Sequence, residues 1–191
     1  MDRQLNGKHL RLRAPQPGDA AWAFERWAQD EVLHRHLGWR AHVSVEQTEQ
    51  QLAWDDARWL KRSAWTWMIV PHGERGPVGV VQLVPQQFDG PPHHLRLGFL
   101  LARPWQRRGW MREAVALVLV HALEQASVWR VDALCDVENQ ASRAVMEGVG
   151  MRNEGRLQCV LRLPNVGEAP RDAWLYSLTK RDLAIAAAEA A

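Results

Sequence analysis

Residues 102–112 read Ala102-Arg103-Pro104-Trp105-Gln106-Arg107-Arg108-Gly109-Trp110-Met111-Arg112, and the rest of the chain is interpreted around them. Residues 95–101 before them are predicted to form a strand, and residues 113–126 after them a helix. The turn therefore leads into a helix N-terminus, where backbone N–H groups lack partners and the helix dipole is positive. Four arginines within these positions add positive charge. This pattern predicts a pyrophosphate-binding site.

The composition is that of one ordinary globular domain. Hydrophobic residues make up 47% of the 191 residues and charged residues 24%, and the formal net charge is +2. Because this charge is small, no DNA partner is expected. No run of about 18 apolar residues and no signal-peptide pattern is found, so we expect no membrane association and a cytoplasmic location. The two cysteines have no metal-binding spacing, so no metal site is predicted. We expect one domain over residues 1–183 and an Ala-rich tail, frayed at its end, over residues 184–191.

Hydrophobic periodicity and turn residues predict the element order β-α-α-β-β-β-α-β-α-β-β, a mixed α+β sheet domain with the crossover helix at its centre. Asp19 is expected to cap the first helix, and Ser44 with Gln47 has the form of a capping box for the second. Besides the central strand and helix, the predicted elements are the strands 9–13, 65–70, 78–84, 128–135, 157–163 and 173–179 and the helices 19–29, 44–62 and 139–147.

Motifs around the central turn resemble the GCN5-related N-acetyltransferase (GNAT) family. Gln106-x-x-Gly109-x-Met111 follows one strand, and Asn139-x-x-Ser142 follows the next. The match is closer to the ribosomal-protein-alanine N-acetyltransferase branch. It is carried by Gln106-x-x-Gly109-Trp110-Met111-x-Glu113-Ala114, Val137-Glu138-Asn139-x-x-Ser142-Arg143, Glu154-Gly155 and Arg171-Asp172-x-x-Leu175-Tyr176. The resemblance implies a GNAT-like, mostly antiparallel central sheet flanked by helices.

The resemblance also implies acetyl-CoA as the cosubstrate. Its pyrophosphate would bind the N–H groups at the start of the central helix, where Gly109 permits close backbone approach. Its pantetheine arm would pair with the edge of the preceding strand, with Asn139 on the other side. Taken singly, the arginines would equally suit a solvated surface, and Asn139 a helix cap. The residues expected to bind the cofactor are Phe99, Leu100, Leu101, Gln106, Arg107, Arg108, Gly109, Trp110, Met111, Arg112, Asn139 and Ser142.

The catalytic groups are less well specified by the motifs. Much of the family has a tyrosine as the general acid where this chain has Met146, so Ser142 is the expected hydroxyl near the sulfur. A common position for the base is a glutamate, and here it is Arg96. The remaining bases are His94, Glu138 or a water molecule, and a histidine has a pKa suited to proton removal from an amine. We therefore expect Ser142 and His94 as catalytic residues, although two prolines before the histidine pair also suit an exposed loop.

The resemblance places an amine acceptor between the first two helices and the last hairpin, lined by residues 34–42 and 164–170, with Trp39 as a floor. No acidic cluster that would hold a polycation is found there. This favours the N-terminal α-amine of a protein, such as a ribosomal protein. Because the chain has no cysteine nucleophile in a convincing setting, direct attack in a ternary complex is expected. The alternatives are a small-molecule acceptor (an antibiotic, polyamine or amino acid), a catalytically silent acyl-CoA-binding protein, and a binder of RNA or of the ribosome surface. A homodimer is left open.

Overall fold

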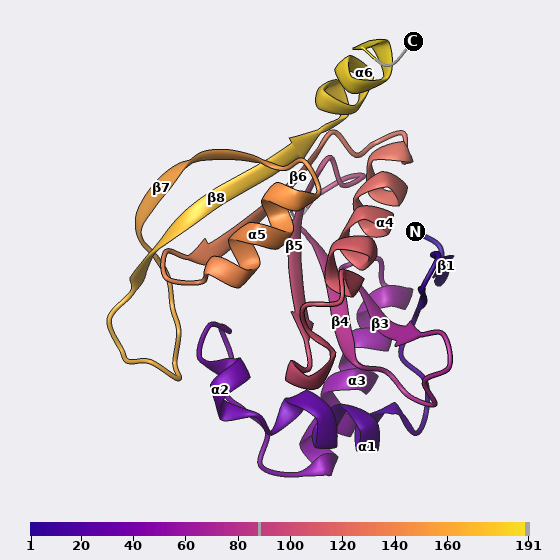
Figure 1. Cartoon of the computed structure of the whole chain (residues 1–191), viewed down its shortest axis with the longest axis vertical. Helices are drawn as coiled ribbons and strands as arrows, with labels where there is room; N and C mark the ends of the chain where they lie inside the picture. The colour runs from indigo at the N-terminus through magenta and orange to yellow at the C-terminus, as the bar shows by residue number, and fades with distance from the viewer. Residues whose placement is uncertain (88, 190–191) are drawn as a thin grey trace.

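The computed structural model describes residues 1–87 and 89–189 and contains one eight-stranded sheet with helices on both faces (Figure 1). The strand order is β1-β2-β3-β4-β5-β6-β8-β7. Among these neighbours only β5 and β6 are parallel. The predicted α+β, mostly antiparallel fold is confirmed. The strands are β1 (Gln4–Asn6), β2 (Leu10–Arg13), β3 (Trp65–Pro71), β4 (Gly79–Pro85), β5 (His94–Leu101), β6 (Arg130–Asp136), β7 (Arg152–Leu161) and β8 (Arg171–Thr179).

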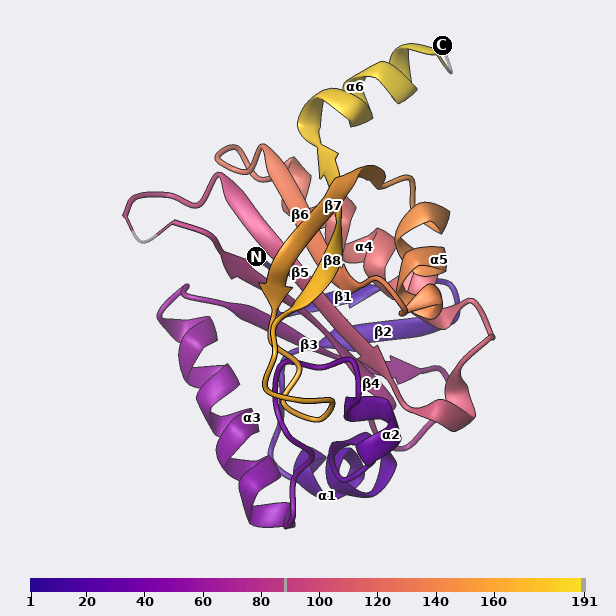
Figure 2. The same ribbon diagram turned by 90° about the vertical axis from the view of Figure 1, so that its left-hand side faces the viewer.

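The helices separate into two layers and a projecting C-terminal helix (Figures 1 and 2). One layer holds α1, η1, α2 and α3, and the other holds α4 and α5. The helices are α1 (Asp19–Ala23), the π-helix η1 (Phe24–Ala28), α2 (Glu31–His34), α3 (Val45–Leu60), the 3-10 turn η2 (Arg103–Trp105), α4 (Trp110–Glu124), α5 (Gln140–Gly148) and α6 (Lys180–Glu189).

Several local expectations differ from the structure. Gly18, not Asp19, is the N-cap of α1, because the Asp19 carboxylate binds the Arg13 guanidinium at 2.6 Å. The sequence analysis missed β1, α2 and α6, all short or peripheral elements. Residues 184–189 of the expected tail belong to α6, and residues 190–191 lie outside the described residues. The capping box of α3 is confirmed, since Ser44 accepts a hydrogen bond from Gln47 N.

Each face of the sheet has its own apolar core, because side chains alternate along the strands. Leu97 of β5 and Cys135 of β6 pack with α4 on one face. Met68 of β3 and Leu100 of β5 pack with Trp27 of η1 on the other. The strand residues between those of one set belong to the opposite face, so every strand side chain can be assigned to the α4–α5 face or to the α1–α3 face.

The strands β5 and β6 pair over a short length and then separate. Ladder pairs join them only over residues 94–96 and 130–132. Beyond these residues β5 continues along β4, and β6 continues along β8. Figure 1 shows β5 and the β6–β8–β7 unit diverging from this point. We call this region, residues 97–101 of β5 and 133–136 of β6, the splay.

Candidate active site

The turn between β5 and α4 presents backbone N–H groups without partners. Gly109 is the N-cap of α4, with φ 79°, and no side chain caps this helix end. The first intrahelical bond runs from Glu113 N to Gly109 O, which leaves the amides of residues 109–112 free of helical partners. Arg107 also adopts a positive φ of 62°, the left-handed conformation that favours glycine, although the resemblance suggests a non-glycine conformation where arginine replaces a loop glycine. This backbone forms a concave group of donors suited to an anion.

The arginines around this turn divide into two kinds. Arg103 is neutralised by Asp30, with Nε to Oδ2 at 2.6 Å, so it adds little free charge. In the part of the chain that the structure describes, Arg107, Arg108 and Arg112 form no ion pair with a carboxylate. All three are exposed. A bound pyrophosphate would therefore meet three available guanidinium groups rather than the four suggested by the sequence.

An aromatic sandwich supports the turn from the α1–α3 side. The Arg26 guanidinium lies between Trp22 and Trp105, at 4.4 and 4.7 Å from the ring centroids. Trp105 also donates its indole N–H to Glu74 Oε1 at 3.1 Å, and Arg26 pairs with the same carboxylate. Gln106, the first residue of the Gln-x-x-Gly motif, donates to Leu101 O at 2.8 Å. These contacts hold the turn at the end of β5.

Along β5, the N–H and C=O groups of successive residues point alternately toward β4 and toward the splay. Hydrogen bonds join Gln86 N to His94 O and Ala102 N to Val78 O, so the even-numbered residues of β5 bond to β4. The peptide groups of Phe99 and Leu101 consequently point away from β4 and into the splay. The peptide groups of Leu100 face β4 opposite Val80. Of the three strand residues expected to bind the cofactor, two therefore present backbone groups to the splay.

The start of α5 lies beyond the end of β6. Asn139 caps this helix, since its Oδ1 accepts a hydrogen bond from Ser142 N at 3.0 Å. The Ser142 side chain lies beside the Cys135 thiol, and burial raises the pKa of that thiol to about 11. The thiol is therefore protonated at neutral pH and is a poor nucleophile. Met146, where much of the family has a tyrosine, is fully buried in the core.

His94 and Ser142 are not brought together. Arg96 binds Asp132 through two hydrogen bonds of 2.8 and 2.9 Å, and His94 Nε2 lies 2.9 Å from the same carboxylate. This cluster occupies the closed end of the splay on the α1–α3 face, whereas Ser142 lies beside Cys135 on the α4–α5 face. Six residues of strand, about 20 Å, also separate the level of His94 from the end of β6.

The segment after α2 and the β7–β8 connection lie against each other (Figure 2). Asn165 donates to His34 O at 2.8 Å and to Trp39 O at 2.7 Å. Trp39 is 49% exposed and packs edge-on against His34, so it covers its own loop. It does not line the nearby pocket described next.

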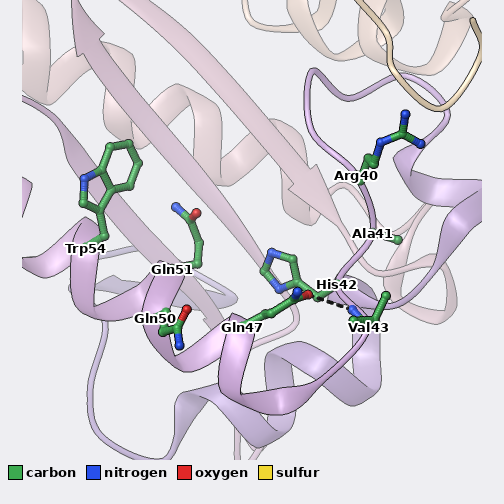
Figure 3. Close-up of a pocket in the computed structure, with 8 residues that line it drawn as sticks. All are labelled: Arg40, Ala41, His42, Val43, Gln47, Gln50, Gln51 and Trp54. Atoms are coloured by element: carbon green, nitrogen blue, oxygen red, sulfur yellow. Dashed lines mark hydrogen bonds between the residues drawn. The ribbon is translucent and has the colours of Figure 1, made fainter.

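A pocket of about 490 Å3 opens between this segment and α3 (Figure 3). Burial lowers the pKa of His42, with a smaller effect from His34, so Arg40 is the one charged side chain among the lining residues. The lining residues are Arg40, Ala41, His42, Val43, Gln47, Gln50, Gln51 and Trp54. The glutamines of α3 were not among the lining residues expected from the sequence, and none of residues 164–170 lines this pocket.

On the α1–α3 face of the sheet, β5 leaves free space at Gly98. This residue lies in the middle of β5, is exposed, and faces the α1–α3 side, as Arg96 and Leu100 do. A Cβ built on Gly98 would meet no atom within 4 Å. A glycine here therefore leaves free space next to the splay, on the face away from Ser142.

Two further classes of site are not found in the described ranges, 1–87 and 89–189. No group of three or more His, Cys, Asp or Glu side chains is placed to hold a metal ion. No described helix combines the length and apolarity needed to cross a membrane.

Structures of known proteins share this fold. The ribosomal-protein-S5-alanine acetyltransferase from Vibrio fischeri superposes with a TM-score of 0.81 at 22% identity, covering 95% of this chain and 98% of that one. RimL, a ribosomal L7/L12 alpha-N-protein acetyltransferase in complex with coenzyme A, gives 0.80 at 20% identity, covering 92% and 97%. The microcin C7 self-immunity acetyltransferase MccE, in complex with acetyl-CoA and AMP, gives 0.80 at 19% identity, covering 91% and 93%.

Sequence comparison identifies the family directly. The uncharacterized N-acetyltransferase YnaD of Bacillus subtilis strain 168 is 32% identical over 63 residues, which span 33% of this chain and 37% of the length of that relative. The model of the acetyltransferase (GNAT) domain matches residues 9–152, a range that includes the turn, the splay and the start of α5. The chain therefore belongs to the GNAT family of acetyltransferases.

Proposed function

We propose that this protein transfers the acetyl group of acetyl-CoA to a primary amine, with a protein N-terminal α-amine as the preferred acceptor. The observation that carries this proposal is the separation of β5 from β6 beside an uncapped helix N-terminus. A strand edge with unpaired peptide groups suits the amide-containing pantetheine arm, and the free N–H groups of α4 suit the pyrophosphate.

The cofactor-binding residues named from the sequence keep these roles in the proposal, in a refined form, except Ser142, which is assigned below as the proton donor. The amides of residues 109–112 and the side chains of Arg107, Arg108 and Arg112 would hold the pyrophosphate. Phe99 would pair with pantetheine through its peptide groups and Leu101 through its N–H, since the Leu101 carbonyl accepts from Gln106. The Leu100 peptide faces β4. Met111 is buried, so it would contribute its N–H only. Asn139 has its Oδ1 engaged in the cap, which leaves its amide N–H groups to donate to the cofactor.

In the reaction a neutral amine attacks the thioester carbonyl, the C–N bond forms, and the C–S bond breaks. The nitrogen loses one proton and the departing thiolate gains one. A splay N–H, from Phe99 or Leu101, would stabilise the negative charge on the carbonyl oxygen. We assign Ser142 as the donor to sulfur and water as the acceptor of the amine proton. We assign His94 no part in this step, because it lies beside Asp132 on the opposite face of the sheet from Ser142.

The pocket supports a peptide acceptor over a polycation. Three glutamine amides, which both donate and accept hydrogen bonds, line it together with Arg40, and no carboxylate does. Peptide main-chain groups match such a lining, whereas a polyamine would meet a positive charge without a counter-charge. A small-molecule acceptor is the second candidate, because MccE, a self-immunity enzyme, shares the fold at a similar TM-score. The homodimer and the cytoplasmic location expected from the sequence stay predictions.

Thiol release from acetyl-CoA tests this function. We expect release with hexapeptides that carry a free N-terminal alanine or serine, and little release with spermidine or free amino acids. Turnover with small amines but not with the peptides would instead support the second candidate function, acetylation of a small molecule. Calorimetric binding of acetyl-CoA without turnover on any amine would instead indicate a silent acyl-CoA-binding protein.

Ser142→Ala tests the proposed acid. We expect kcat to fall about 100-fold, a typical loss when a positioned proton donor is removed, with the Kd of acetyl-CoA unchanged. Gln140→Ala, in the first turn of the same helix, is the control and is expected to retain kcat. A wild-type kcat in Ser142→Ala would exclude Ser142 as the donor to sulfur.

A further inference from the structure

A buried carboxylate on α3 has no cationic partner. Asp55 is 4% exposed, and burial raises its pKa. Among the residues that the structure describes, no lysine, arginine or histidine forms an ion pair with it. Arg58, the nearest charge of opposite sign, instead stacks on Trp54 at 4.3 Å. A buried carboxylate without a counter-charge costs stability, and such groups gather at functional sites.

The hydrogen bonds of Asp55 go to two glutamine amides. Gln51 Nε2 donates to Asp55 Oδ2 at 3.2 Å, and Gln82 Nε2 donates to Asp55 Oδ1 at 3.1 Å. Gln82 Nε2 also lies 2.7 Å from Thr66 Oγ1. A carboxylate only accepts, so Asp55 forces the NH2 end of the Gln82 amide toward α3. The orientation of the Gln82 amide is therefore determined by its surroundings.

This orientation leaves the other end of the Gln82 amide available. Within residues 1–87 and 89–189, no donor bonds to Gln82 Oε1, and this oxygen is not among the buried atoms that lack a partner. It is therefore in contact with solvent. Gln82 lies opposite Gly98 in the β4–β5 ladder, and both face the α1–α3 side. Because Gly98 has no side chain, the strand position next to Gln82 on this face is free space.

The same hydrogen-bond network reaches the pocket on α3. Gln51 both bonds to Asp55 and lines the pocket shown in Figure 3. Hydrogen bonds thus connect Gln51, which lines the pocket, with Gln82 through the buried Asp55, and Gln82 lies opposite Gly98. An acceptor that extends from the pocket across the sheet surface at Gln82 toward Gly98 would place its amine at the splay.

We propose that Gln82 binds the attacking amine by accepting one of its N–H groups at Oε1, and that Asp55 is a positioning residue that holds the Gln82 amide in this orientation. This inference rests on the proposed function. One N–H bonded to a neutral carbonyl oxygen leaves the nitrogen lone pair free to attack the thioester. A neutral acceptor also avoids holding the amine as an unreactive ammonium ion, which a carboxylate in direct contact would favour.

The experiment measures steady-state thiol release with a hexapeptide carrying a free N-terminal alanine, or with spermidine if only spermidine is turned over. Gln82→Met removes the amide at nearly constant volume. We expect the KM for the acceptor to rise about 10-fold, the loss typical of one hydrogen bond, with the KM for acetyl-CoA unchanged. Asp55→Asn keeps the shape but lets the Gln82 amide turn over, so we expect a rise of about 3-fold in the acceptor KM.

The matched control is Ser177→Ala. Ser177 is another fully buried polar residue, on β8, where it donates to Glu154 at 2.6 Å. We expect this variant to change thermal stability but neither KM. Unchanged acceptor KM values in folded Gln82→Met and Asp55→Asn would overturn the inference while leaving the proposed function intact. If Gln82→Met does not fold, the acceptor KM of Asp55→Asn alone tests the inference. No thiol release by the wild type with any amine would overturn both proposals.

Discussion

Gly109→Asp is expected to weaken acetyl-CoA binding about 100-fold. The residue lies at the uncapped N-terminus of α4, where the proposed pyrophosphate would bind. A carboxylate about 5 Å from a phosphate charge costs about 3 kcal/mol at an effective dielectric constant of about 20, which corresponds to roughly 100-fold in Kd. Aspartate must adopt the positive φ of Gly109, which strains the backbone, although its charge interacts well with the helix dipole. Isothermal titration with acetyl-CoA measures the effect.

Gly109→Asn is the control for the backbone. Asparagine must adopt the same positive φ as aspartate and has nearly the same shape, but it is uncharged. The difference in Kd between the two variants therefore isolates the electrostatic repulsion. Equal Kd values for Gly109→Asp and Gly109→Asn would show that no phosphate binds next to this residue.

Gly98→Leu is expected to reduce kcat/KM for the acceptor roughly 100-fold, because a displacement of the amine by about 1 Å from its attack position costs this much. The new side chain would enter the free space on the α1–α3 face, next to the splay. The fold should tolerate it, since Gly98 has no positive φ and a glycine weakens a strand interior. We expect the Kd of acetyl-CoA to change little. Thiol release at varied acceptor concentration gives kcat/KM for the acceptor, and calorimetry gives the Kd of acetyl-CoA.

Gly98→Ala is the companion variant. A Cβ at this position meets no atom within 4 Å, so the smaller side chain should leave most of the activity. A graded loss from alanine to leucine would locate the acceptor over Gly98. Wild-type kcat/KM in Gly98→Leu would show that the acceptor approaches the thioester from elsewhere.

The fold was largely predictable because its signals are local. Residues 95–101 and 113–126 follow strand and helix periodicity, and the turn between them has the glycine and arginines of an anion site. The structure confirms the strand and helix there, with α4 beginning at Trp110. Such features depend on neighbours in the sequence, so a single sequence carries them. The positive φ of Arg107 was not predictable, because a non-glycine residue disfavours that conformation.

The pairing of side chains across the sheet was not predictable in the same way. The sequence does not show that Arg96 is neutralised by Asp132, that His94 joins the same carboxylate, or that Arg103 is held by Asp30. Each of these contacts joins residues 36 or more positions apart, and those of Asp132 depend on sheet register. Nor does the sequence show that His94 and Ser142 lie on opposite faces of the sheet, since His94 is placed by strand alternation and Ser142 lies beside Cys135.

The buried network on α3 was missed for a related reason. Asp55 and Gln51 are four residues apart on a helix, a spacing that is common on solvated helix surfaces. Only the packing of α3 against β3 and β4 shows that Asp55 is buried and bonded to Gln82. Residues that contact the acceptor are therefore harder to recognise from sequence than residues that contact the cofactor, whose motif is local.

The most direct test of the central claim is a crystal structure of the wild-type protein grown with acetyl-CoA. We expect the pyrophosphate within hydrogen-bond distance of the backbone amides of residues 109–112. We also expect the pantetheine arm between β5 and β6, bonded to the peptide groups of Phe99 or Leu101. A cofactor bound at any other place, with the splay empty, would contradict the assignment of this site.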